Sequence, residues 1–249
     1  MIIARKCLLD GIAKSECQPM SPVHTAFHGV SGKGGRVGAA AVPEDYRYFT
    51  LDSSPAKEEQ AKVYGILADY ITTFRRQFDE GGERVKSLYL WSESPGTGKT
   101  TTASALLNEY LITHFVGSIQ RGLTPLQRPA YFLDANQLQT EYTAFNRPRV
   151  PDDIAEPASR RYYKSIERAK DTPFVVIDDI GVRDVTEGFR SDLHTVINYR
   201  TVNRLPTVYT SNVPMAELPR IFGEQRLFDR IRDQCLPIHF EGESKRGRR

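Results

Sequence analysis

Ser94-Pro95-Gly96-Thr97-Gly98-Lys99-Thr100 is the stretch that decides the fold, because it lies between a short apolar segment and a helical pattern. Residues 87–91 read as a strand, and a helix is expected from residue 99 to about 115. A strand, a glycine-rich turn and a helix N-terminus in this order form a phosphate-binding loop. The predicted nucleotide-binding residues are Pro95, Gly96, Thr97, Gly98, Lys99, Thr100 and Thr101.

Two residues of this loop have predicted chemical roles, and one neighbour departs from the full motif. Lys99 supplies positive charge to the phosphates, and the Thr100 hydroxyl is a Mg²⁺ ligand. The full pattern G-x-x-x-x-G-K-[ST] has glycine where Glu93 stands. The amides nearest the phosphates come later in the loop, so ATP binding is expected to survive. The run Gly32-Lys33-Gly34-Gly35 lacks a preceding strand and is expected to be a flexible loop.

Alternation of strands and helices along the chain predicts the fold class. Helical patterns separate further apolar segments at 129–133, 173–177, 206–210 and 236–240. Continuous apolar strands between helices are typical of a parallel sheet covered on both faces. We therefore predict an α/β fold with a parallel five-stranded sheet. Ser54-Pro55 is expected to start a helix that ends before Gly81, and 146–157 to form a proline-rich connection to a basic helix at 158–170.

Acidic residues follow the most apolar strand, and polar residues follow the next one. Asp178 is predicted to hold Mg²⁺ and Asp179 to polarise the attacking water, since ligands bind at the carboxyl edge of a parallel sheet. The alternative is a turn with two solvated aspartates. Asn212 ends the following strand and is predicted to orient water beside the γ-phosphate; a plain turn before Pro214 is the alternative.

The overall composition excludes several classes of protein. The 249 residues are 39% hydrophobic and 26% charged with a formal net charge of +3, as in ordinary globular proteins. No apolar run suits a membrane span or a secretory signal, and three cysteines fit the reducing cytoplasm. Four of the positive charges lie in the last five residues, so the rest of the chain is nearly neutral. DNA affinity would therefore have to come from local basic groups.

The motifs PGTGKT, VVIDDIG, INYR, LPTVYTSN and RLFDRIRD occur in an order that resembles the DnaC/DnaI-type replicative helicase loaders of the AAA+ class. The related IstB-type transposase helpers share much of this pattern. The resemblance extends from about Leu51 to the C-terminus. It implies that Lys99 and Thr100 are the Walker A pair, Asp178 and Asp179 the Walker B pair, and Asn212 the first sensor.

The resemblance also implies an assembly of several subunits. Arg230 matches an arginine finger that acts on a neighbouring subunit's γ-phosphate. Arg226 is the second candidate, and a local ion pair between Asp229 and Arg230 is the alternative. A helical lid is not expected after the last strand, and Arg246 in the basic tail is the candidate second sensor. The expected organisation is a loop-rich N-terminal segment (1–50), an ATPase core (51–241) and a basic tail (242–249).

Two further groups of residues suggest ligands. Basic residues on one predicted helix are candidate contacts for single-stranded DNA, with Tyr162 and Tyr163 as stacking partners and a solvated basic face as the alternative. These basic residues are Arg160, Arg161, Lys164 and Arg168. The N-terminal segment offers four candidate zinc ligands, with free cysteines and ordinary loop histidines as the alternative. These candidates are Cys7, Cys17, His24 and His28.

The predicted function is that of an ATP-dependent loader, with weak ATPase activity that DNA or assembly stimulates. The resemblance implies that residues 1–47 bind the hexameric replicative helicase, which the protein places on single-stranded DNA and leaves on ATP hydrolysis. Alternatives are an IstB-like helper that binds duplex DNA and a transposase, and a nucleotide-binding adaptor with negligible hydrolysis. The expected location is the bacterial cytoplasm, with a phage or mobile element as a possible source of the gene.

Overall fold

The computed structural model describes residues 7–9, 21–181, 186–219 and 225–244, and only the backbone of residues 225–228. These residues form two compact units, which are described separately. The first comprises the residues up to 85 together with 101–131, and the second comprises 86–100 together with 132–249. The predicted boundaries at residues 50 and 241 separate an N-terminal segment, an ATPase core and a basic tail by their expected functions, and they stay predictions.

The first unit contains the N-terminal helices and most of the helix that follows the phosphate-binding loop. Its elements are α1 (Pro22–His28), α2 (Gly35–Ala39), η1 (Glu44–Tyr46), α3 (Ala61–Thr72), η2 (Thr73–Phe78) and α4 (Lys99–Gln120), of which α4 begins in the second unit.

The N-terminal segment packs onto α4. The rings of Phe27 and Phe115 lie 5.0 Å apart, and Phe27 is fully buried. Arg36 is 6% exposed and donates hydrogen bonds to the carbonyl oxygens of Ala26, Pro125 and Leu126 at 2.6–2.9 Å. A buried guanidinium needs several acceptors, so these contacts fix α2 against the chain that follows α4.

The glycine-rich run is more ordered than the sequence suggests. Gly35 begins α2, so the expectation of a flexible loop is wrong for this part of the run. A Cβ at Gly35 would lie 2.6 Å from the carbonyl oxygen of Phe27. The absence of a side chain therefore lets α1 and α2 approach each other closely.

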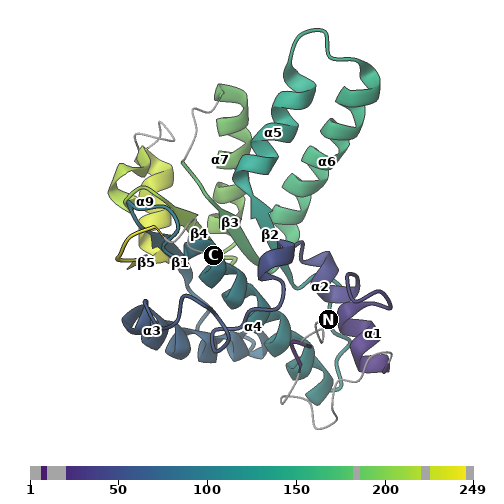
Figure 1. Ribbon diagram of the computed structural model, residues 1–249, viewed down its shortest axis with the longest axis vertical. Coiled ribbons are helices and arrows are strands. Elements are labelled where there is room, and N and C mark those ends of the chain that lie inside the picture. The colour runs from purple at the N-terminus through teal and green to yellow at the C-terminus, as the bar shows by residue number, and fades with distance from the viewer. Residues whose placement is uncertain (1–6, 10–20, 182–185, 220–224, 245–249) are drawn as a thin grey trace. The chain divides into compact units, whose positions relative to one another are not determined.

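A five-stranded sheet organises the second unit (Figure 1). Its strands are β1 (Ser87–Trp91), β2 (Ala130–Asp134, which begins in the first unit), β3 (Phe174–Asp178), β4 (Thr207–Ser211) and β5 (Cys235–His239). Their order is β2-β3-β4-β1-β5, and the pairings β3–β4, β1–β4 and β1–β5 are parallel. Trp91 pairs with both Ser211 and His239, so the loop after β1 starts level with the ends of β4 and β5.

Helices α5 (Ala135–Asn146), α6 (Asp152–Asp171), α7 (Glu187–Val202) and α9 (Gln225–Gln234) accompany this sheet, with the short η3 (Met215–Glu217) after β4. Helix α6 packs against α5 and α7, and α7 packs against α9. In Figure 1 the loop between α5 and α6 lies at the end of the pair that points away from the sheet. The predicted α/β class and five-stranded parallel sheet are confirmed.

Two predicted helix starts are wrong. The helix expected at Ser54-Pro55 begins at Ala61, because the Ser54 hydroxyl bonds the Tyr64 hydroxyl at 2.5 Å and accepts from the Ala56 amide in a series of turns. Helix α6 begins at Asp152 and contains Pro157, which was expected in a connection. Pro157 stands in the second turn of α6, where its missing N–H leaves out one helical hydrogen bond, and the acidic residues of the first turn favour a helix start at Asp152.

Arg200 on α7 is the largest fully buried side chain of the described residues. Its guanidinium donates to the carbonyl oxygens of Ala169, Lys170, Thr172, Pro173 and Pro206 and to the Thr207 hydroxyl, at 2.7–3.4 Å. These acceptors lie at the end of α6 and at the starts of β3 and β4. The Arg200 side chain therefore joins α6 and α7 to the amino ends of β3 and β4. The carboxyl ends of these two strands carry the polar site residues.

No helix among the described residues is both long enough and apolar enough to cross a membrane.

Candidate nucleotide site

The loop between β1 and α4 has the backbone that phosphate binding requires. Gly96 and Gly98 have φ angles of 75° and 97°, in the left-handed region that favours glycine. Alternation of ordinary and left-handed residues makes a concave run of amides that suits an anion. Among the residues predicted to bind nucleotide, Thr97 and Thr101 are buried and Pro95 is exposed.

Lys99 is held inside this loop. The residue is 7% exposed, and its Nζ donates to the Ser94 carbonyl oxygen at 3.0 Å and approaches the Ser92 carbonyl at 3.5 Å and the Thr97 hydroxyl at 3.4 Å. These oxygens hold the ammonium in the loop. A positive charge at this position suits the charge of a bound phosphate.

Glu93 fits its position without the glycine of the full motif. Among the described residues other than glycine, only Ala41, Arg149, Asp179 and Arg204 have positive φ angles. Glu93 therefore has an ordinary backbone conformation, and its side chain is exposed. The loop does not need glycine at this point.

Asp178, at the end of β3, lies against Thr100. The Thr100 hydroxyl donates to its two carboxylate oxygens at 3.0 and 3.2 Å, and the Thr210 hydroxyl donates to Oδ1 at 2.6 Å. The structure thus brings together the two predicted Mg²⁺ ligands. Hydroxyl and carboxylate oxygens are hard donors, which this cation prefers.

Burial raises the pKa of Asp178 to about 6. The hydrogen bonds from Thr210 and Thr100 lower this pKa, whereas the charges of Asp179 and Asp134 raise it further. In the absence of a cation, the site therefore holds a carboxyl group that ionises close to neutral pH. A bound Mg²⁺ would compensate the carboxylate and favour its ionised form.

Asp178→Asn is expected to stabilise the metal-free protein at pH 7.5 but not at pH 4. The folded protein holds the Asp178 proton more tightly than the unfolded chain, so wild-type stability falls as pH rises from about 4 to 6. A shift from 3.8 to about 6 corresponds to about 2–3 kcal/mol. Urea unfolding without nucleotide or Mg²⁺ measures this difference. Asp52→Asn, at an exposed carboxylate, is the control, and an Asp178→Asn effect independent of pH would contradict the prediction.

Asp179 is positioned by two contacts, one from its backbone and one from its side chain. Its backbone N–H donates to the Thr210 hydroxyl at 2.8 Å, and its Oδ2 accepts from the Asn136 amide at 2.6 Å. Asn136 lies in the first turn of α5, where Asp134 caps the helix by accepting from two backbone N–H groups. Asp134 is the last residue of β2 and Asn136 lies two residues later, and these polar residues at the strand end were the signal that sequence reasoning missed.

The end of β4 contributes through Thr210. Thr210 is buried and contacts both acidic residues, through the Asp178 carboxylate and the Asp179 amide. Asn212, the predicted first sensor, lies two residues later and is half-buried. Its place after β4 agrees with the predicted position, and its role in orienting water stays a prediction.

Arg230 is exposed on α9, and its Nη1 donates a hydrogen bond to the Asn198 side chain on α7. The neighbouring Asp229 pairs with Arg232 at 3.2 Å. The alternative partner considered for Arg230 thus has a salt bridge of its own. Arg226, the second finger candidate, has no described side chain, and Arg246 lies outside the described residues.

The basic residues of α6 differ in their surroundings. Arg160 pairs with Glu156 at 2.6 Å and Arg161 with Glu141 at 3.1 Å. Lys164 is exposed and Arg168 is half-buried. Two of the four predicted DNA contacts are therefore partly neutralised by carboxylates.

The two tyrosines of α6 also differ. Tyr162 is fully buried and donates to Asp192 at 2.7 Å, so the expectation that it stacks on bases is wrong. Helical spacing turns Tyr162 toward α7, whereas Tyr163 is 54% exposed.

Three of the four candidate zinc ligands lie together in the first unit. The ligand atoms of Cys7, His24 and His28 are all within 4.8 Å of one another. Cys17 lies outside the described residues.

Comparisons with known proteins agree with this fold. Residues 154–249 match the family described as IstB-like ATP binding protein. The chain is 28% identical over 196 residues to the replicative helicase loader DnaI of Bacillus subtilis, a match that covers 72% of this chain and 53% of DnaI. It is 25% identical over 175 residues to the replicative helicase loader DnaC of Escherichia coli K12, covering 70% of this chain and 62% of DnaC.

The crystal structure of the DnaC helicase loader has the same fold, with a TM-score of 0.55 at 21% identity over 80% of this chain and 100% of that chain. The chain spans between about half and two thirds of the length of the two curated relatives. The resemblance inferred from the order of the motifs is confirmed.

Proposed function

We propose that this chain, which has an IstB-like ATP-binding domain and is homologous to the DnaI and DnaC helicase loaders, is an ATPase that loads a hexameric replicative helicase onto single-stranded DNA. The observation that carries the ATPase part is the contact of Thr100 with Asp178 beside the glycine loop that holds Lys99. The homology supports the loader part, since both named relatives are replicative helicase loaders.

ATP and Mg²⁺ would bind at the loop between β1 and α4. Thr100 and Asp178 would hold the cation, and Lys99 and the loop amides would bind the phosphates. The cation supplies charge compensation when it is bound. Asp179 then accepts the proton of the water that attacks the γ-phosphate. Asn136 holds its carboxylate, and the Thr210 hydroxyl holds its backbone N–H.

Arg230→Ala is expected to lower ATPase activity in the assembled state at least about tenfold, because the finger's positive charge stabilises the transition state on a neighbouring subunit. ATP binding by the isolated chain should not change, since Arg230 is exposed and its Asn198 partner is neutral. Steady-state phosphate release and nucleotide titration measure the two properties. Arg232→Ala, on the same helix and paired with Asp229, is the matched control. Full assembled activity in Arg230→Ala would refute the finger assignment.

Single-stranded DNA would contact α6 through Lys164 and Arg168, with Tyr163 as the exposed aromatic side chain. Phosphate contacts of this kind are salt-dependent and independent of sequence. The ion pairs of Arg160 and Arg161 would have to open before these side chains bind DNA. The same proposal has the protein act in the bacterial cytoplasm.

Co-purification with a hexameric replicative helicase tests the loader function. Tagged protein is expected to retain the helicase with ATP and to release it after hydrolysis. Retention of a transposase and duplex DNA in its place would favour the IstB-like alternative. Binding of neither, together with negligible phosphate release, would favour the nucleotide-binding adaptor.

The role of the N-terminal segment needs a substitution that leaves its packing intact, since Phe27 and Arg36 are buried against the rest of the unit. Val30 lies in this segment and is 80% exposed. Val30→Asp is expected to weaken helicase retention at least about fivefold without loss of ATP binding, since an exposed substitution barely changes stability. Val202→Asp, at a 62% exposed site on α7, is the matched control. Equal retention by both variants would contradict helicase binding by this segment.

A further inference from the structure

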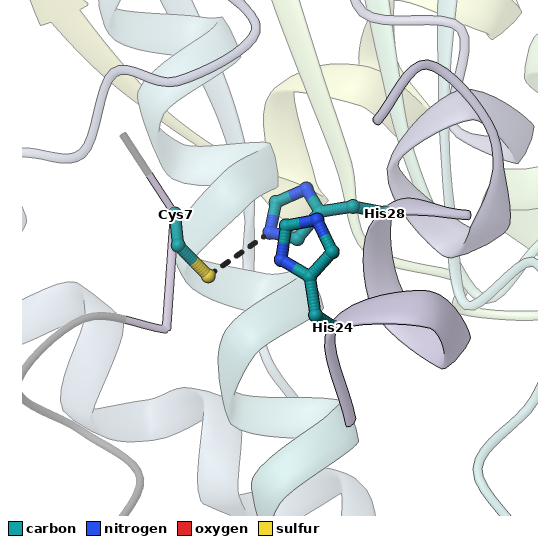
Figure 2. A group of neighbouring side chains, drawn as sticks. All are labelled: Cys7, His24 and His28. Carbon is teal, nitrogen blue, oxygen red and sulfur yellow. Dashed lines mark hydrogen bonds between the residues drawn. The ribbon is translucent and has the colours of Figure 1, made fainter. Parts of the chain in front are cut away.

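We propose that Cys7, His24 and His28 bind a zinc ion that fixes the start of the chain to α1. Their ligand atoms all lie within 4.8 Å of one another, and the Cys7 Sγ and His28 Nε2 atoms are 3.2 Å apart. Figure 2 shows the three side chains converging, with the two imidazole rings next to each other and the thiol directed at His28. The proposal does not rest on the loader function, and the three ligands lie within residues 1–47, the segment proposed to bind the helicase.

Local sequence places the two histidines on one face of α1. Ser21 caps the helix by accepting a hydrogen bond from the His24 N–H at 3.1 Å, and Pro22 follows at the first helical position. Gly29, with a φ of 73°, ends the helix directly after His28. Residues four apart on a helix are neighbours, so the two rings lie with their centroids 4.8 Å apart.

The geometry is close to what a zinc ion would impose. With Zn–S near 2.3 Å and Zn–N near 2.0 Å, ligand atoms at tetrahedral angles are about 3.3–3.6 Å apart. The Sγ–Nε2 separation of 3.2 Å is within a few tenths of an ångström of that range. Rotation of the side chains would shorten the longest separation between ligand atoms, which is at most 4.8 Å. A thiolate with two imidazoles favours zinc over the hard cations Mg²⁺ and Ca²⁺.

The surroundings make such an ion structurally useful. Leu8 and Leu9, next to Cys7, are 4% and 1% exposed, and His28 is 1% exposed. Phe27, between the two histidines on α1, packs on Phe115 of α4. A zinc ion would thus cross-link positions 21 residues apart in the sequence and hold residues 7–9 on a helix that is itself anchored. Binding free energy of a structural metal adds directly to folding free energy.

Three protein ligands carry the proposal. A tetrahedral ion takes one more ligand, which can be water or a fourth side chain. The three described ligands are sufficient to test the site, because removal of any of them would break it.

Metal analysis of the purified full chain is the first test. About one zinc ion per chain is expected in the wild type, and at least about tenfold less in Cys7→Ser and His24→Gln, because each removes a direct ligand. His239→Gln removes an exposed histidine of β5 and should keep the full zinc content. Zinc absent from the wild type, or retained in full by Cys7→Ser, would overturn the proposal.

Cobalt substitution keeps the test valid if a variant folds poorly. Metal-free wild-type protein should bind one Co²⁺ per chain and show a thiolate-to-cobalt charge-transfer band together with the visible absorption of tetrahedral cobalt. It should also unfold at a higher temperature after zinc is restored. A wild-type protein that gives neither band nor stabilisation would overturn the site without recourse to any variant.

Discussion

Lys99→Ala is expected to raise the dissociation constant for ATP at least about 100-fold, which corresponds to about 3 kcal/mol of lost binding free energy. The Lys99 ammonium is nearly excluded from water and is held by neutral oxygens of the loop. In the Lys99→Ala variant, a phosphate that binds there would lose its water without gaining a compensating side-chain charge from this loop. Isothermal titration with ATP in the presence of Mg²⁺ measures the loss.

Lys33→Ala is the matched control for this substitution. Lys33 also lies in a glycine-rich stretch, but its side chain is 63% exposed and pairs with Glu44 at 2.9 Å. This variant should bind ATP as the wild type does. If Lys33→Ala lost ATP and Lys99→Ala kept it, the phosphate site would have been assigned to the wrong glycine-rich stretch.

Arg200→Ala is expected to destabilise the protein by about 3–5 kcal/mol, the size expected when a cavity and several unsatisfied buried acceptors are created together. The guanidinium is completely buried and satisfies five backbone carbonyl oxygens and one hydroxyl. The substitution would leave a cavity and several buried acceptors without a donor. Urea unfolding followed by circular dichroism gives the free energy of unfolding.

Arg160→Ala separates this effect from the general loss of an arginine. Arg160 lies on the surface of α6 in an exposed ion pair, so its removal should cost well under about 1 kcal/mol. Arg200→Lys should remain strongly destabilised, because a lysine ammonium has fewer donors than the planar guanidinium. A fully stable Arg200→Lys protein would show that charge alone, and not the fork of donors, is required.

The sequence predicted the sheet and the phosphate loop well because their signals are local. All five predicted strands occur, each within one residue of its expected position. The predicted helix starts at Ser54 and near Ala158 were wrong for different reasons. The Ser54 side chain makes a tertiary contact that competes with helix formation, and the start of α6 is decided by the residues at its N-terminus. Ser54 bonds a tyrosine ten residues away, and α6 starts at an acidic first turn and continues through Pro157 in its second turn.

The residues of the nucleotide site could be predicted only where they belong to a recognisable sequence motif. Thr100 and Asp178 were expected to share a cation, and the structure places them in contact. The Asn136 contact to Asp179 joins residues 43 positions apart, and only the strand order brings them together. Arg200 was noted only as part of a family motif, since nothing in its local sequence reveals that it is buried.

Asp179 has a φ angle of 63°, which limits the residues that can stand directly after β3. Glycine, asparagine and aspartate tolerate this left-handed conformation far better than other residues do. Of these three, only aspartate can accept a proton from water. The backbone conformation thus restricts the residue type at position 179, and the need for a proton acceptor then selects aspartate. A glutamate here would have a side chain longer by one methylene but would strain the main chain. Asp179→Asn is consequently the replacement that removes the base while leaving the turn relaxed.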